Sequence, residues 1–148
     1  KEKTKNKISN IKRNINFIKN KLLDKPNDLG LMLILASNYA MIGEFDTEID
    51  VLKRILNIKQ NTMVQSLLAQ ALLRKNNGIV DLKIKNLISK IIEKNPKNEG
   101  ANYILGLYHK QIGDNKKANK IWTDLLKTLK PNNPFISLIQ NNLKQMSN

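Results

Sequence analysis

Few side chains in this sequence have the types and spacing that catalysis or metal binding requires. The only histidine, His109, has neither a second histidine nor a cysteine with which to form a catalytic pair or a ligand set. The chain also contains no Gly-rich phosphate loop, dinucleotide fingerprint or paired-histidine motif. We therefore interpret His109 as a structural residue at a helix-packing position. The sequence predicts a protein that is not an enzyme and has no catalytic residue, cofactor or metal.

Four acidic side chains lie close together in the sequence, as they would in a cation-binding loop. They are Glu44, Asp46, Glu48 and Asp50. This cluster lacks the glycine and the terminal glutamate of a calcium-binding loop. We interpret it as the solvated start of a helix, and we expect the single tryptophan, Trp122, to lie in the core.

The net charge of +14 would favour polyanionic partners, but the composition argues against specific nucleic-acid recognition. Only three of the 26 basic residues are arginine, the side chain whose planar fork reads phosphates and bases bidentately. The absence of cysteine excludes disulfides, thiol catalysis and Cys-based zinc sites. The longest apolar run is too short to span a bilayer. Because the chain begins at Lys1 and not at Met, we expect it to be a piece of a longer protein.

The stretch Gly106–Trp122 has the pattern of a DNA-binding helix-turn-helix, yet its layout occurs three times in the chain. The three segments are Leu31–Gln60, Ser66–Pro96 and Asn102–Pro131. Each has a helical pattern, a Gly-containing turn, a second helical pattern and a break. Small residues recur at intervals of 33 and 37, at Ala36, Ala69 and Gly106. The breaks recur at intervals of 34, 36 and 35, at Pro26, Gln60, Pro96 and Pro131. This is the tetratricopeptide (TPR) period, so the stretch is half of a repeat.

The sequence therefore predicts an all-α, TPR-like helical-repeat solenoid with three helix-turn-helix repeats and a flanking helix at each end. The second repeat carries about three extra residues between Leu72 and Ile84, which predicts a lengthened loop. Asp28 and Asp114 are candidate N-caps. We expect a basic tail or linker over 1–7 and a single TPR domain over 8–148, divided into an N-terminal helix (8–25), repeat 1 (29–61), repeat 2 (62–98), repeat 3 (99–132) and a capping helix (135–146).

The first helix of each repeat is expected to line a concave surface. Counted from the small residue of each repeat, the lining residues form an apolar groove with a polar rim that suits an amphipathic helix. They are Leu33, Ser37, Met41, Ser66, Gln70, Leu73, Tyr103, Leu107 and Lys110. Leu33 and Ser37 stand where a clamp for a terminal carboxylate would need Lys and Asn, so such a clamp is not indicated. The alternative is that the lining residues are buried against the N-terminal helix.

Three motifs in order resemble one known family. They are "KNKLLDKPNDLGLMLILASNYAMIGEFDTEI", the loop "LLRKNNGIVD", and "YILGLYHKQIGDNKKANKIWTDLLKTLKPNNPF". Over residues 16–146 the chain resembles the C-terminal TPR domain of the CcmI/CycH cytochrome c-type biogenesis proteins, which are related to the NrfG-like subunits.

The resemblance implies a periplasmic, bacterial domain, membrane-anchored through a segment upstream of Lys1. It implies a chaperone that holds the C-terminal helix of apocytochrome c and contacts subunits of the haem-ligation complex. No haem ligand is implied. Two alternatives remain: a basic helical-repeat scaffold that binds nucleic acid or anionic membrane, and a TPR adaptor in another protein assembly.

Overall fold

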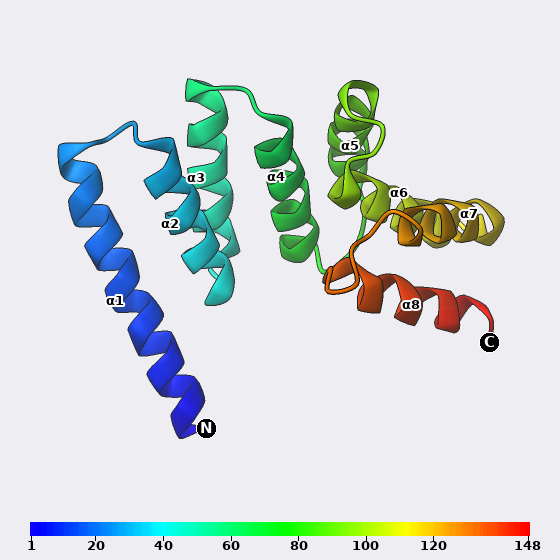
Figure 1. The fold of residues 1–148 in the computed structure, drawn as a ribbon, viewed down its shortest axis with the longest axis horizontal. Helices are drawn as coiled ribbons and strands as arrows, with labels where there is room; N and C mark the ends of the chain where they lie inside the picture. Colours follow the sequence, from blue (N-terminus) through cyan, green and yellow to red (C-terminus); the bar gives the residue numbers. More distant parts are fainter. The chain divides into compact units, whose positions relative to one another are not determined.

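The computed structural model describes all residues from 1 to 148 and contains eight α-helices and no strand (Figure 1). The helices are α1 (Glu2–Asp24), α2 (Leu29–Met41), α3 (Phe45–Ile58), α4 (Thr62–Lys75), α5 (Leu82–Lys94), α6 (Glu99–Gln111), α7 (Asn115–Leu126) and α8 (Phe135–Met146). These bounds confirm the three predicted helix pairs and the two flanking helices.

The chain is divided into two compact units, where the sequence led us to expect one domain. Unit 1 is Lys1–Lys75 and contains α1 to α4; unit 2 is Asn76–Asn148 and contains α5 to α8. The division falls in the second repeat, at its lengthened loop. That loop has six residues, between Lys75 and Leu82, whereas the turns after α2 and α6 have three residues each. The boundary between the two units thus coincides with the longest connection between the two helices of a repeat.

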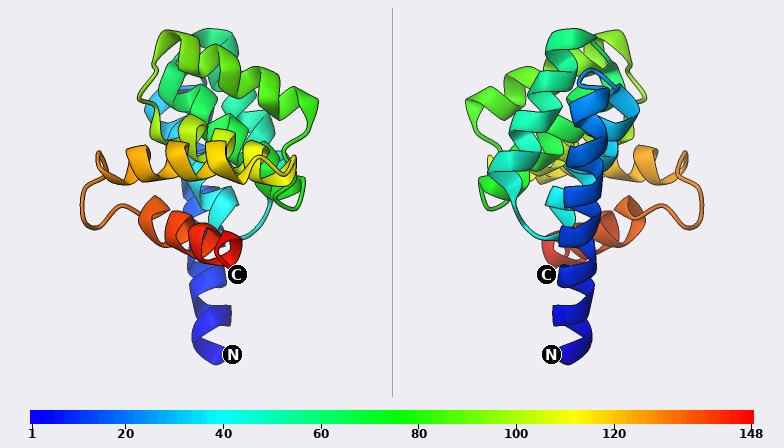
Figure 2. Two further views of the ribbon diagram at one scale, coloured as in Figure 1. Left: turned by 90° about the vertical axis from the view of Figure 1, so that its right-hand side faces the viewer. Right: turned by 90° about the vertical axis from the view of Figure 1, so that its left-hand side faces the viewer.

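In unit 1, α1 packs on α2 through one apolar line and is the longer of the two helices (Figures 1 and 2). Its buried residues are Ile11, Ile15, Ile18 and Leu22. Residues 1–10 are all exposed, yet the helix begins at Glu2 and so includes all but the first residue of the segment 1–7 that we expected to be a tail or linker. The physical reason is local: this segment has no Pro or Gly and is rich in lysine, a good helix former.

The remaining helices of unit 1 form consecutive antiparallel neighbours. Asp28 caps α2 by accepting a hydrogen bond from the Leu31 N–H at 3.0 Å, as predicted. Gly43 closes the turn before α3 with φ of 76°, a conformation that glycine adopts without a steric penalty. The amphipathic α3 buries Ile49, Leu52 and Ile55, and it packs on both α2 and α4.

In unit 2, the lengthened loop is fixed by backbone conformation and by one side chain of α6. Asn77 and Gly78 both adopt positive φ, 54° and 81°. The Gln111 amide donates to the Gly78 carbonyl at 2.6 Å and accepts from the Val80 N–H at 2.9 Å. Asp81 then caps α5 by accepting from the Ile84 N–H. The extra residues are thus an ordered part of the unit.

Helices α6 and α7 approach each other closely at Gly106. A methyl group on Gly106 would overlap Nε1, Cε2 and Cδ1 of the Trp122 indole, so only glycine fits there. Trp122 is fully buried, and its Nε1–H donates to the Tyr103 carbonyl at 3.1 Å. The predictions of a small residue at the helix contact and of a core tryptophan are both confirmed. Asp114 caps α7 through the Lys117 N–H, also as predicted.

Candidate functional site

The nine residues predicted to line a groove are distributed over three helices and differ in their surroundings. In α2, Met41 and Ser37 are exposed and Leu33 is half-buried. In α4, Ser66 and Leu73 are buried. The Gln70 amide bonds back to the Ser66 carbonyl and hydroxyl, both at 3.2 Å, so Gln70 stabilises its own helix. Within unit 1, the exposed members of the predicted set are therefore those of α2.

In unit 2 the predicted lining residues of α6 are contacted by α8. The Tyr103 and Phe135 rings lie 5.2 Å apart between centroids, and Tyr103 and Leu107 are buried. The Lys110 ammonium donates to Asn142 Oδ1 at 2.8 Å and to Gln145 Oε1 at 2.7 Å. The alternative in the sequence analysis named the N-terminal helix, whereas the helix that contacts Tyr103 and Lys110 in unit 2 is α8, at the C-terminal end.

The exposed surface of α2, which we call the α2 face, has no charged residue. It consists of Gly30, Leu33, Ile34, Ser37 and Met41, spaced so that they share one side of the helix. Ile34 and Met41 are 52% and 62% exposed. No residue of the whole helix is charged, which is unusual for a helix with a solvated side. Exposed apolar side chains on an uncharged helix make this face a candidate for contact with another molecule.

A cleft of about 200 Å³ extends the α2 face toward the start of α4. It is lined by Leu29, Gly30, Leu33, Ile55, Lys59, Asn61, Met63 and Val64. Met63, which is 54% exposed, forms the far wall. Sequence reasoning missed both Met63 and Ile34. The signal that could have found Ile34 is the absence of charge from α2: the helix has more apolar residues than the core can bury.

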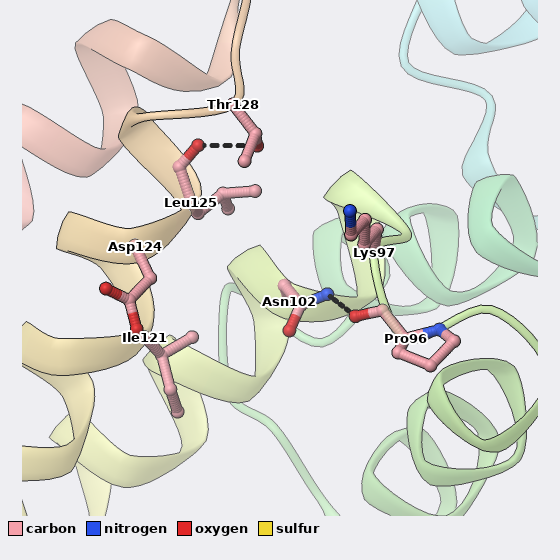
Figure 3. Close-up of a pocket in the computed structure, with 7 residues that line it drawn as sticks. All are labelled: Pro96, Lys97, Asn102, Ile121, Asp124, Leu125 and Thr128. Carbon is pink, nitrogen blue, oxygen red and sulfur yellow. Dashed lines mark hydrogen bonds between the residues drawn. The ribbon is translucent and has the colours of Figure 1, made fainter.

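Unit 2 has a cleft of similar size, about 230 Å³, between the start of α6 and the end of α7 (Figure 3). Its lining is Pro96, Lys97, Asn102, Ile121, Asp124, Leu125 and Thr128. Three of its polar side chains are already engaged within the chain. Asn102 Nδ2 donates to the Pro96 carbonyl and Thr128 Oγ1 to the Leu125 carbonyl, both at 2.9 Å. The Lys120 ammonium donates a hydrogen bond to Asp124 Oδ2 at 3.1 Å, and this bond lowers the pKa of the Asp124 carboxyl. This cleft offers little chemistry for binding or catalysis.

The acidic cluster is only partly the solvated helix start that we expected. Glu48 is buried, and Arg74 of α4 donates to its Oε1 at 2.6 Å. Burial raises the pKa of Glu48, and the charge of Arg74 opposes that rise. The Arg74 guanidinium also lies 5.6 Å from the centre of the Phe45 ring. Sequence reasoning missed this ion pair because its partners are 26 residues apart.

No cluster of histidine and acidic residues in the chain has the arrangement of a metal site. His109 is half-buried on α6, and its Nδ1 is buried without a hydrogen-bond partner. Burial, with help from the positive charge of Lys117, lowers the pKa of His109. No helix combines the length and the hydropathy that crossing a bilayer requires.

Solved structures of MamA resemble this chain. One crystal structure of MamA superposes with a TM-score of 0.64 at 21% identity, over 84% of this chain and 67% of MamA. The structure of MamA MSR-1 C2 gives 0.58 at 14% identity, over 96% and 72%. A further MamA crystal structure gives 0.56 at 22% identity, over 76% and 65%. The fold is TPR-like. At these identities the similarity shows the fold alone, and neither a protein-family model nor a curated protein matches the sequence.

Proposed function

We propose that this chain is a non-catalytic protein-binding module that holds an amphipathic helix of a client protein on the α2 face. The observation that carries the proposal is the exposure of Ile34 and Met41 on a helix without a charged residue. A protein that used α2 only as a structural element would be expected to carry charge on its solvated side. The TPR-like fold supports the proposal because repeats of this kind present the first helix of each pair to partners.

The chemistry of the α2 face suits a helix. Gly30 and Ser37 are small, so a partner backbone can approach closely between the larger side chains. Ile34 and Met41 are seven residues, or about two helical turns, apart. They would contact the residues i and i+7 of a partner helix whose apolar residues recur at i, i+3 or i+4, and i+7. The cleft between Leu33 and Met63 can accept one apolar side chain of that helix. The flexible thioethers of Met41 and Met63 adapt to the shape of the partner.

The sequence resemblance supports a more specific client, the C-terminal helix of apocytochrome c. In this proposal the domain works in the periplasm, tethered to the membrane, and delivers the client to the haem-ligation complex. The lack of cysteine suits that task, because the chain cannot form disulfides with the client's thiols. A TPR adaptor in another assembly would use the same α2 face with a different client.

The test is fluorescence anisotropy of a labelled apocytochrome c C-terminal helix peptide, with a scrambled peptide and a labelled oligonucleotide alongside, each at two salt concentrations. Sequence-dependent binding that tolerates salt would support the proposal. Binding of the oligonucleotide alone, lost at high salt, would instead favour a basic scaffold. Binding of other amphipathic helices but not of this peptide would retain the module and reject the specific client.

A matched pair of variants locates the site. Met41→Asp places a charge on the α2 face and should weaken peptide binding at least about tenfold, the cost of about 1.4 kcal/mol. Leu82→Asp makes the same kind of change at an exposed leucine of unit 2 and should leave binding unchanged. Both positions are exposed, so the helical circular dichroism of both variants should match the unmodified chain. Equal loss in the two variants would contradict the assignment to α2.

A further inference from the structure

The helix α1 carries positive charge that the rest of the chain does not neutralise. From Lys3 to Leu23 it contains seven basic residues and no acidic residue. None of the chain's six ion pairs involves α1. One cation of this helix contacts an aromatic ring within the same helix: the Lys21 ammonium lies 4.7 Å from the centre of the Phe17 ring. This unpaired charge is available to an external partner.

Part of this charge forms a continuous line along the helix, which we call the basic stripe. It consists of Lys1, Lys5, Ile8, Lys12, Asn16, Lys19 and Leu23, and every member is exposed. Intervals of three and four residues place these side chains on one side of an α-helix. At 1.5 Å per residue the stripe is about 33 Å long. It runs beside the line of buried residues from Ile11 to Leu22, so packing of α1 on α2 leaves it accessible.

We propose that the basic stripe binds the surface of an anionic membrane, with α1 lying parallel to the bilayer. Lysines near such a surface are attracted by the potential of its anionic headgroups. The stripe also contains two apolar residues, Ile8 and Leu23, which are 38% and 79% exposed. Helices that lie in the membrane interface combine cations with apolar residues that enter the headgroup region.

The same features disfavour nucleic acid as the partner. The stripe contains no arginine, the residue best suited to bidentate contacts with phosphates and bases. It contains no aromatic residue on which a base could stack. An exposed leucine such as Leu23 gains nothing from a phosphate backbone, whereas it gains from leaving water for the bilayer interface. The stripe shares no residue with the α2 face, so this inference does not depend on client binding.

The test is sedimentation of the whole chain with vesicles of phosphatidylcholine alone and of phosphatidylcholine with phosphatidylglycerol. We expect binding to the anionic vesicles only. The variant Lys5→Gln/Lys12→Gln/Lys19→Gln should weaken that binding on the order of 100-fold, at about fivefold per lysine. Glutamine is a good helix former, so α1 should persist. Leu23→Ser should weaken binding several-fold without changing the charge.

The control is Lys83→Gln/Lys90→Gln/Lys116→Gln, which removes the same charge from three exposed, unpaired lysines of unit 2. It should change vesicle binding less than about threefold, because these lysines are not part of the basic stripe. Equal loss in the two triple variants would overturn the inference, because binding would then follow net charge alone. No binding to anionic vesicles would also overturn it. Tighter binding to a duplex oligonucleotide at the same ionic strength would reassign the stripe to nucleic acid.

Discussion

Helices α2 and α6 occupy the same place in two repeats, yet one presents a surface and the other is an internal interface. Both have 13 residues and begin at a side-chain cap, Asp28 or Asn98. Leu33 of α2 is half-buried, whereas its counterpart Tyr103 is buried and its ring lies tilted by 35° against the ring of Phe135. The difference comes from α8, which covers α6 in unit 2. The place of a residue in the repeat therefore does not by itself decide whether it binds a partner.

The inner sides of the two helices show a second difference. In unit 1 the small residue is Ala36, and Leu52 follows it by 16 residues; in unit 2 the pair at this interval is Gly106 and Trp122. Leu52 and Trp122 are both almost fully buried. A larger side chain on the second helix thus goes with a smaller one on the first. Close packing requires this compensation, because little volume is available for adjustment in a core.

The largest effect should come from disturbing this pair in unit 2. Gly106→Ala should lower the free energy of unfolding by about 3 kcal/mol, because its methyl group overlaps the indole of Trp122. In the background of Trp122→Leu, the same change recreates the Ala–Leu pair found in unit 1 and should cost less than about 1 kcal/mol. Urea unfolding of the four proteins, followed by circular dichroism, measures both costs.

Trp122→Leu alone should also destabilise the chain, because it leaves a cavity and removes the bond to the Tyr103 carbonyl. The comparison depends on the interaction between the two changes and not on either cost alone. An equal cost of Gly106→Ala in both backgrounds would show that the indole is not what excludes the methyl group.

A smaller effect is expected from the buried ion pair that joins α3 to α4 in unit 1. Arg74→Ala leaves the Glu48 carboxylate buried without a partner, and we expect a loss of about 2 kcal/mol at pH 7, reduced because Arg74 is partly exposed. Lys75→Ala removes a neighbouring cation whose partner, Asp46, is exposed. That control should show no measurable change in urea unfolding.

The pH dependence of Arg74→Ala has a definite sign. The pKa of Glu48 is raised in the fold, so the protonated form is favoured there, and stability is lost as pH rises above the ordinary value of 4.5 through the folded value. Removing Arg74 removes the charge that opposes this rise. The loss caused by Arg74→Ala should therefore be smaller at pH 5 than at pH 7. A loss independent of pH would mean that packing of Arg74 on Phe45, and not its charge, stabilises the pair.

The sequence was sufficient for the helix pairs and their caps because these depend on local signals. Small residues and chain breaks recur at the period of the repeat, and Asp28 and Asp114 each mark the start of a helix. The start of α1 was missed because its first seven residues contain no start signal other than their helix propensity. The division into two units was missed because the lengthened loop indicates an insertion without showing which contacts it interrupts.

The candidate site was predictable only in part for the same reason. Ser37 and Met41, counted from Ala36, are exposed, and their neighbours lie in the same helix pair. The same count from Gly106 placed Tyr103 and Leu107 in a groove, although both are buried and Phe135 of α8 lies against Tyr103. Whether a first helix is covered depends on an element more than 20 residues away. Residue spacing within one repeat carries no information about that element.

The smallest expected effect concerns position 109, where unit 2 has histidine and the matching place in unit 1 has Tyr39. Burial, with the charges of Lys117 and Lys85, lowers the pKa of His109, and Asp114 only partly opposes them. A histidine whose folded pKa is lowered contributes stability above its ordinary pKa of 6.5, and this contribution is lost as pH falls through the folded value. His109→Tyr, which brings the residue of unit 1 into unit 2, and His109→Gln should both reduce the loss of unfolding free energy between pH 7 and pH 5.5.

Glu48 titrates in all three proteins, so its effect cancels in the comparison. A loss that is unchanged in both variants would show that protonation of His109 does not oppose folding, and that its buried Nδ1 is reached by water.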